Sequence, residues 1–542
     1  MSSGHDSPGI DPSKDIKASI KTASTFSDDS LSQNPFLDAK IAEYYRGVYE
    51  RANYECRHVF DPNLEWTPKE ERKLVRKLDW HVCTWACIMF FALQVDRGNL
   101  KQAVSADMLK ELHLTTNDYN YGNTIFLVSF LLAEVPSQLI SKKLGPDRWI
   151  PMQMTLWSVV ACSQAVLTGK GSFYACRVLL GVLEGGFIPD LVLWLSYFYT
   201  SRELPIRLSF FWTALDVTTI ITSLLAFGLL HLDNVAGMAG WRWLFLIEGL
   251  ITLLVGIASW FLMPASAVST KAWYRPNGWF SDREVGIVVN RVLRDDPSKG
   301  DMHNRMAITP IRLWKALKDY DLWPLYAIGL IVYIPMGPTA TYLTLELRSL
   351  GFSPFTTNLL VIPTTAASIV TLLGLTWLSE KVGERSFISM IQNLWVLPCI
   401  AALRWWAGSG INAWGTYALV TVLLSYPYCH AIVVGWTSRN AGSVRTRSIS
   451  AACYNMCVQL GGVVYSNIYR KDDKPLYHRG NTVLFAINIL AIALFVFTKF
   501  YYSARNRYRE KKWNAMTAEE KEVYVNTTKD EGNKRLDFRF AH

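Results

Sequence analysis

The chain has 542 residues, of which 50% are hydrophobic and 18% are charged. Soluble domains carry about 25% charged residues, so the composition excludes an ordinary water-soluble domain for most of the chain. A formal net charge of +10 could suggest nucleic-acid binding, but the Lys and Arg residues lie between apolar runs. In that position they are typical of topology determinants beside lipid head groups, and no nucleic-acid partner is expected.

Twelve apolar segments follow one another along the chain, and a helix needs about 20 such residues to cross a membrane. The first six lie near residues 80–100, 121–141, 149–168, 173–199, 207–231 and 242–263. After a polar stretch, six more lie near 322–345, 355–378, 386–406, 412–436, 447–469 and 481–502. The pattern predicts an all-α polytopic membrane protein with twelve transmembrane helices in two six-helix halves, residues 79–264 and 322–503.

Three polar regions flank these halves. Residues 1–78 contain no long apolar segment and are expected to form a disordered polar tail; residues 265–321 would be a central loop and residues 504–542 a C-terminal tail. An even number of crossings puts both termini on one side, and basic flanks of the first and last spans put that side in the cytoplasm. The flanking residues are Lys69, Arg72, Lys73, Arg76 and Lys77, and Arg505, Arg507, Arg509, Lys511 and Lys512.

Charged and strongly polar side chains lie inside several spans. A charge at the bilayer centre costs about 2.5–3.5 kcal/mol, so each needs a partner, water or a function. The candidates are Asp96, Arg97, Asn99, Glu134, Arg177, Glu184, Arg242 and Glu248 in the first half, and Asn455 and Gln459 in the second.

Structural roles are open for several of these candidates. Arg177 and Arg242 could extend to the outer head groups. Asp96 and Arg97 could form a capping or loop pair. Glu184 could either form a static bridge to an arginine or carry a proton.

Small residues and prolines indicate where helices pack closely or break. The pairs Gly185-Gly186 and Gly461-Gly462 favour close helix contacts or local bending. Four prolines inside spans are expected to kink or break their helices. They are Pro189, Pro335, Pro363 and Pro427.

Signatures of soluble catalysis are missing from the sequence. It contains no phosphate-binding glycine-rich loop with the required Lys-Ser/Thr, no paired-histidine metal motif and no hydrolase nucleophile elbow. Eight of the nine cysteines lie in apolar runs and are interpreted as small buried hydrophobes. We therefore expect no metal and no cofactor, and an ion gradient as the energy source for any uphill transport.

Six short motifs occur in order along the chain. The first half contains Asp96-Arg97-Gly98-Asn99, Glu134-Val135-Pro136-Ser137, Arg177-x-Leu-Leu-Gly181-x-x-Glu184-Gly185-Gly186 and Gly240-Trp241-Arg242-Trp243 followed by Glu248-Gly249. The second half contains Asn440-x-Gly442-x-x-Arg445-x-Arg447 and Gln459-x-Gly461-Gly462. From about residue 80 to 502, this order resembles the fungal anion:cation symporter family, the allantoate-permease branch of the major facilitator superfamily. Asp190 departs from the family pattern, which usually has Gly there.

The resemblance implies uptake of a small organic anion with a proton across the plasma membrane, by a carrier that we expect to be monomeric. Family substrates include allantoate, nicotinate, pantothenate, biotin, cysteine and sulfonates. Two halves would alternate around a central cavity. Arg97 or Arg177 would bind the anion, and Glu134 or Glu184 would accept the proton.

The remaining candidates have supporting roles in this hypothesis. Asn455 and Gln459 would contribute neutral hydrogen bonds from the second half, and Arg242 and Glu248 are expected to form a structural pair. The remaining structural or gating residues are Asp96, Asn99, Gly185, Gly186, Gly461 and Gly462.

Two other classes of protein are alternatives. A nutrient sensor of transporter ancestry would carry an enlarged cytoplasmic tail, whereas the C-terminal tail here has about 40 residues. An integral-membrane enzyme would need an acidic metal-binding pair on a loop. The loop candidate is Asp295-Asp296, whose neighbours are typical of a solvated linker.

Overall fold

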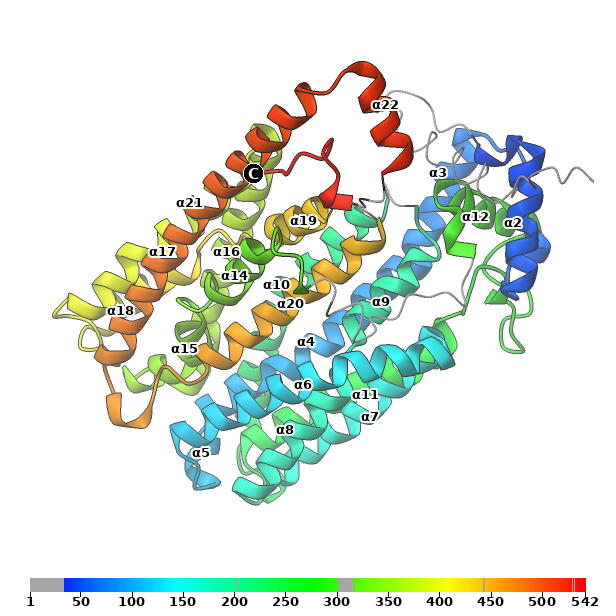
Figure 1. The fold of residues 1–542 in the computed structure, drawn as a ribbon. Helices are drawn as coiled ribbons and strands as arrows, with labels where there is room; N and C mark the ends of the chain where they lie inside the picture. The colour runs from blue at the N-terminus through cyan, green and yellow to red at the C-terminus, as the bar shows by residue number, and fades with distance from the viewer. Residues whose placement is uncertain are drawn as a thin grey trace, which may run out of the picture.

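The computed structural model describes residues 34–200, 203–300, 314, 317–441, 444–528, 530 and 532–542. Within these ranges the chain is helical, and extended pairing is limited to one bridge between Ala272 and Arg275. The helices of the first half gather on one side of the bundle and those of the second half on the other (Figure 1).

Within the part of the chain that the structure describes, twelve helical spans build the bundle. Those of the first half are α4 (Thr84–Ser105), α6 (Thr116–Leu144), α7 (Pro146–Ser163), α8 (Lys170–Glu184) with α9 (Phe187–Ser196), α10 (Leu204–Leu229) and α11 (Gly240–Leu262). Those of the second half are α14 (Trp323–Ile331) with α15 (Gly337–Ser349), α16 (Pro354–Val382), α17 (Ser386–Trp405), α18 (Ala413–Leu424) with α19 (His430–Asn440), α20 (Val444–Tyr465) and α21 (His478–Asn514). Among the described residues, seven helices are long and apolar enough to cross a membrane. The predicted all-α fold is confirmed. The twelve spans, counted with the shorter and the broken helices, are consistent with the predicted number.

Three spans consist of two helices each, and their breaks follow the sequence. Gly185 and Gly186 separate α8 from α9, Pro335 lies between α14 and α15, and Pro427 lies between α18 and α19. Proline lacks an N–H group and clashes with the preceding turn, so a helix ends near it. Pro189 lies in the first turn of α9, directly after the break at Gly185 and Gly186, where the missing N–H costs nothing. The helix α16 continues through Pro363 without ending there.

Residues 34–78 correct the expectation of a disordered tail. They form α2 (Ala39–Arg51) and α3 (Pro68–Leu78), which lie with α12 (Asp282–Asp295) at one end of the bundle (Figure 1). We call this end, where α3 leads into α4, the terminal end, and the opposite one the distal end. Residues 1–33 of the predicted tail lie outside the described residues.

The central loop is also more ordered than a plain linker. Its helix α12 is amphipathic and buries Val288 against the N-terminal helices. Lys77 Nζ lies 2.7 Å from Glu284 Oε2, and Arg291 Nη1 lies 2.9 Å from Glu203 Oε1. The loop and the N-terminal segment therefore form one cap on the terminal end of the first half.

The C-terminal segment packs against the terminal end of the second half. The backbone oxygen of Ala541 accepts from Trp436 Nε1 at 2.7 Å and from Asn440 Nδ2 at 3.1 Å, and its N–H donates to Asn440 Oδ1 at 2.8 Å. Phe540 is buried against the Tyr502 ring, with ring centres 5.0 Å apart. This segment joins α19 to α21.

Hydrogen bonds join the two halves at the distal end. Asn120 Nδ2 donates to the backbone oxygen of Tyr469 at 2.6 Å, and the Tyr342 hydroxyl donates to Asn120 Oδ1. The Thr344 hydroxyl donates to the backbone oxygen of Lys101 at 2.7 Å. Asn120 is 2% exposed, so water does not compete for its bonds. The distal end is closed in this structure.

The substitution Asn120→Ala should weaken this closure. It leaves the Tyr342 hydroxyl and the Tyr469 carbonyl without partners, at about 1–3 kcal/mol for each buried group. Spin labels at Lys110→Cys and Arg479→Cys, whose native side chains are exposed, should then move apart. Double electron–electron resonance measures that distance.

Asn412→Ala is the matched control, because Asn412 caps α18 at the same end but bonds within the second half. Loss of this cap should lower thermal stability by about 1 kcal/mol and leave the label distance unchanged. An identical distance distribution in Asn120→Ala and the wild type would contradict the interpretation.

Candidate functional site

The break between α8 and α9 depends on two glycines. Gly186 has φ +83°, and a Cβ there would lie 2.5 Å from Ser137 Oγ. A Cβ on Gly185 would lie 2.8 Å from Ala133 Cβ. The positive φ of Gly186 is free of strain only for glycine. Because neither glycine has a side chain, α8 can approach α6 closely. Gln153 Nε2 donates to the backbone oxygen of Gly185 at 3.0 Å, which satisfies a carbonyl at the break.

Arg97 of α4 and Glu184, the last residue of α8, form an ion pair beside this break. Arg97 Nε lies 2.7 Å from Glu184 Oε2, and the side chains are 22% and 1% exposed. The Arg97 guanidinium lies 4.9 Å from the centre of the Phe130 ring, and its Nη2 has no hydrogen-bond partner among the described residues. Removing one partner of such a buried pair costs about 3–5 kcal/mol. Of the two roles predicted for Glu184, the structure contains the first, a bridge to an arginine.

A second buried cation lies on α8. Arg177 is 4% exposed and donates to the side chain of Gln164. The rings of Phe126 and Phe173 lie 6.0 and 5.8 Å from its guanidinium carbon. Protein surrounds this side chain, which excludes the alternative that it extends to the head groups.

Arg242 pairs with a residue other than the expected one. Its Nη2 lies 3.1 Å from Glu111 Oε1, and its Nη1 donates to the backbone oxygen of Ala165 at 2.8 Å. Glu248 follows six residues later, which is about 240° further around the helix, so the two side chains leave α11 on different faces. The predicted pair of Arg242 and Glu248 is wrong.

Asp96 and Glu248 are buried acids that make no ion pair among the described residues. Asp96 is 1% exposed and Glu248 is 0% exposed. Asp96 Oδ2 accepts from Trp157 Nε1 at 3.1 Å. Asp96 lies within α4 and not at its end, which excludes the capping-pair alternative. Asn99, one turn further on, is fully buried, and its side-chain amide has no hydrogen-bond partner in the described part of the chain.

Glu134 lies on α6 between the two halves. Its side chain is 7% exposed, and it interacts electrostatically with the Cys453 thiol on α20. Within the described ranges its carboxyl makes no ion pair and no hydrogen bond. Glu134 is thus a buried acid on a helix that contacts α20 of the second half.

The candidates of the second half lie on α20. A Cβ on Gly461 would collide with a carbonyl oxygen of α14, and a Cβ on Gly462 would lie 3.1 Å from Leu127 Cδ1 of α6. Asn455 precedes Gly462 by seven residues, about two helical turns, and so lies on the same face. Asn455 is exposed and Gln459 is partly exposed.

Sequence reasoning missed the partners of these charges and of the carbonyl group at the break between α8 and α9. They are Glu111, Gln153, Trp157 and Gln164. The two glutamines interrupt an otherwise apolar run near 149–168, and this interruption could have marked them as partners of buried polar groups. Glu111 lies in a polar connection between spans, where one more charged residue does not stand out. Gly442 and the side chains of Asp216, Arg445 and Arg447 lie outside the described part of the structure.

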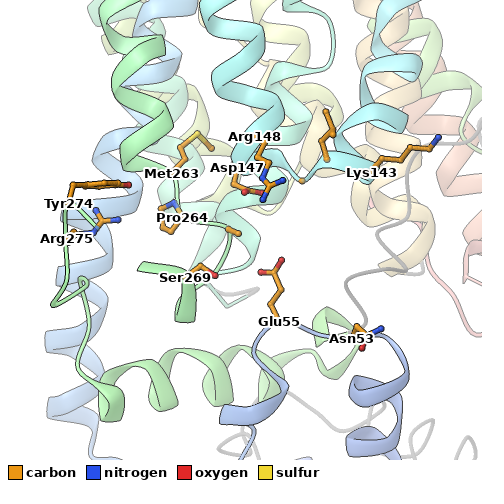
Figure 2. Close-up of a pocket in the computed structure, with 13 residues that line it drawn as sticks. Asn53, Glu55, Lys143, Asp147, Arg148, Met263, Pro264, Ser269, Tyr274 and Arg275 are labelled. Carbon is orange, nitrogen blue, oxygen red and sulfur yellow. The ribbon is translucent and has the colours of Figure 1, made fainter. Parts of the chain in front are cut away.

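A separate polar cavity of about 520 Å³ lies at the terminal end. Figure 2 shows it between the N-terminal segment, the start of α7 and the segment that follows α11. Its lining includes Glu55, Lys143, Asp147, Arg148 and Arg275, and none of the candidate residues. No group of three or more metal-ligating side chains occurs within the described ranges.

The fold and the buried charges together define a class of protein. Twelve spans in two groups, some of them broken beside intramembrane charges, are typical of a polytopic membrane carrier. The family model of the Major Facilitator Superfamily matches residues 86–466. The chain belongs to this superfamily and is a multi-pass membrane transporter, not an enzyme.

Relatives and solved structures agree with this assignment. The chain is 46% identical to an uncharacterized transporter of Saccharomyces cerevisiae over 97% of both chains. It is 24% identical to a major facilitator-type transporter of Emericella nidulans, over 84% of this chain and 90% of that one.

Two solved structures share the fold. One is a bacterial homolog of the human lysosomal transporter Spinster in an inward-facing, occupied conformation, with TM-score 0.58, 13% identity, and 77% and 96% of the two chains covered. The other is the xylose transporter XylE of E. coli, with TM-score 0.56, 13% identity, and 76% and 96% covered.

Gly186→Ala should destabilise the transporter. The left-handed backbone costs a residue with a Cβ about 1–2 kcal/mol, and the contact with Ser137 adds about 1–3 kcal/mol of overpacking. Thermal unfolding of the detergent-purified protein, followed by size-exclusion chromatography, measures the loss. Gly171→Ala on α8 is the control, because nothing lies within 4 Å of an added Cβ there and its φ is not positive. Equal midpoints for the two variants would contradict the proposed reason for the glycine.

Proposed function

We propose that this transporter imports a small organic anion together with a proton by alternating access. The observation that carries the proposal is the buried pair of Arg97 and Glu184 at the broken span. An arginine whose acidic partner can be protonated is a site where an anion and a proton can be bound together.

Arg97 suits an anion because part of its guanidinium is unoccupied. Only Nε contacts Glu184, and Nη2 has no hydrogen-bond partner among the described residues. Guanidinium groups bind carboxylate, sulfonate or phosphate oxygens through two parallel N–H groups. The neighbouring Phe130 ring holds the guanidinium in place and excludes water.

Exchange of partners couples the two ligands. When an anion binds the free N–H groups of Arg97, one cation faces two negative groups, and the charge of the buried Glu184 is no longer fully compensated. A buried carboxylate without a partner is costly, so Glu184 takes up a proton. Release of the proton restores the pair and expels the anion.

Other candidates complete the site in this proposal. Arg177 is a second cation for the anion, and Glu134 is a second proton acceptor placed where the halves meet. Asn455 and Gln459 supply neutral hydrogen bonds from the second half. They would bind the parts of the substrate that carry no charge.

The terminal end is cytoplasmic in the same proposal, and the protein works as a monomer in the plasma membrane. The closed distal end would then be the outer gate. When the distal end opens, the terminal end would close. Basic residues beside the first and last spans support this orientation.

The substrate class follows from the resemblance to the anion:cation symporters. Arg97 selects a compact anion, and the family's carboxylates and sulfonates fit that chemistry. Uptake of labelled allantoate, nicotinate, pantothenate, biotin, cysteine and taurine by cells that express the protein, against cells that lack it, identifies the substrate. Faster uptake at acidic outer pH and inhibition by an uncoupler are expected. A nutrient sensor of transporter ancestry would give no net uptake of any of them.

Arg97→Gln should reduce uptake of the identified substrate at least tenfold, which is about 1.4 kcal/mol, because the anion loses its cation. Glu184→Gln should retain exchange of labelled for unlabelled substrate while losing stimulation by outer acid. Arg242→Gln is the matched control, since it breaks an arginine–glutamate pair at the distal end. Wild-type uptake in Arg97→Gln with normal surface expression would refute the proposal.

A further inference from the structure

Two broken spans of the second half come together near the middle of the bundle. The breaks between α14 and α15 and between α18 and α19 each lie near the middle of a span, and α20 runs beside α14 and α19 (Figure 1). Transporters bind their substrates near this depth, at discontinuous helices. Four rings from three spans gather at this place, those of Tyr333, Tyr428, His430 and Tyr454.

The four rings form a short stack with a wall on each side. The rings of Tyr428 and His430 are nearly parallel, with an interplanar angle of 8° and centres 5.5 Å apart. Tyr333 meets Tyr428 edge to face at 5.5 Å, and the centre of the Tyr454 ring lies 5.5 Å from that of His430. The hydroxyls of Tyr333 and Tyr454 are 2.6 Å apart, and His430 Nδ1 lies 3.4 Å from the Tyr454 hydroxyl. The cluster therefore combines ring faces with a hydrogen-bonding edge.

The neighbouring helix α17 supports both breaks. Asn393 Nδ2 donates to the backbone oxygen of Val332 at 3.2 Å, and Gln392 Oε1 accepts from the backbone N–H of Cys429 at 2.9 Å. Irregular backbone at membrane depth persists only where its polar groups are bonded. Gln392 Nε2 is buried and has no hydrogen-bond partner among the described residues. It leaves a donor for a ligand atom beside the start of α19.

The half-buried rings of this cluster point away from the lipid. On α17, Leu394 and Trp395 are 45% and 38% exposed, so this helix covers the breaks on the lipid side. Tyr428 and His430 point toward the break after α14 and toward α20 and are half-buried. The helix α20 in turn contacts α6 of the first half. The accessible parts of the two rings therefore lie on the inner side of the second half.

We propose that Tyr333, Tyr428, His430 and Tyr454 form a ring subsite that binds a flat aromatic ring of the substrate anion. The inference rests on the proposed function for the charge of the substrate, which Arg97 would bind. A flat ring continues the stack of Tyr428 and His430, and offset or edge-to-face contacts favour it over a saturated group of the same size. The hydroxyls and the imidazole bond a ring nitrogen or a polar ring substituent. The substrate class is an aromatic or heteroaromatic carboxylate or sulfonate.

Binding of two simple anions to the purified full-length protein tests the ring subsite without transport. The probes are benzoate and cyclohexanecarboxylate, which have the same charge and nearly the same size and differ in the aromatic ring. Titration calorimetry at millimolar concentrations measures both dissociation constants. The wild type should bind benzoate about tenfold more tightly. Tyr428→Leu should remove this preference by weakening benzoate and leaving cyclohexanecarboxylate unchanged.

Tyr428→Phe is the matched control, because it keeps the ring and should keep the preference. Phe497→Leu is a second control, since Phe497 is a 57% exposed ring on α21 outside the cluster. His430→Gln removes the other stacked ring and replaces Tyr428→Leu if that variant does not fold. Equal affinities in the wild type, no binding of benzoate, or an unchanged preference in a folded Tyr428→Leu or His430→Gln variant overturns the proposal.

Arg97→Gln separates this inference from the proposed function. It should weaken both anions by a similar factor and leave the preference for benzoate in place. If the wild type prefers benzoate and Arg97→Gln binds both anions as tightly as the wild type, the proposed function fails and the ring subsite stands. If Arg97→Gln weakens both anions but the wild type shows no preference, the ring subsite fails and the proposed function stands.

Discussion

A charge inside an apolar bundle must be paired or neutralised, and the first half of this transporter is arranged around that constraint. Arg97 and Glu184 meet this requirement by a contact of 2.7 Å between α4 and α8. Neither helix can shift alone without separating the two charges. The glycines at the end of α8 allow it to approach α6, so the ion pair and the glycines together hold α4, α6 and α8 against one another.

The buried polar contacts of the second half differ from those of the first half. Its buried polar contacts within the bundle are largely neutral, such as Asn393 Nδ2 donating to Asn488 Oδ1 at 2.7 Å and the hydroxyls of Tyr333 and Tyr454 at 2.6 Å. Among its described residues, the fully buried acid in ion pairs is Asp321, which lies at the terminal end. Neutral bonds need no counter-ion, so breaking one of these contacts leaves no unpaired charge behind.

Much of the fold could be predicted because its signals are local. Apolar length marks each span, and glycine and proline mark the breaks near Gly186, Pro335 and Pro427. The cap at the terminal end was missed although it had a signal, since Thr67 and Glu70 form the capping box that begins α3. Mean hydropathy shows only whether a segment is apolar on average. Amphipathic helices such as α3 and α12 are polar on average, so hydropathy does not identify them.

The site could be predicted only in part, because pairing is a property of packing and not of sequence distance. The charged positions were identifiable from their cost in a membrane. Their partners were not, since Arg242 meets Glu111, 131 residues away, and not Glu248. Helical geometry alone would have excluded the latter pair, because six residues place two side chains on different faces.

Charge balance also explains why the proposed transport would be coupled. In the proposed cycle, the empty carrier has Arg97 paired with Glu184, and the loaded carrier would have Arg97 paired with the anion and Glu184 protonated. Both states are neutral around Arg97, and both can be enclosed as the halves rock. A carrier with the anion alone or the proton alone keeps one uncompensated charge, which must be desolvated and moved through the membrane field at about 2.3 kcal/mol per 100 mV. In the proposed cycle, closure around the site would therefore be favoured for the empty and the fully loaded carrier, and a carrier with one ligand would stay open.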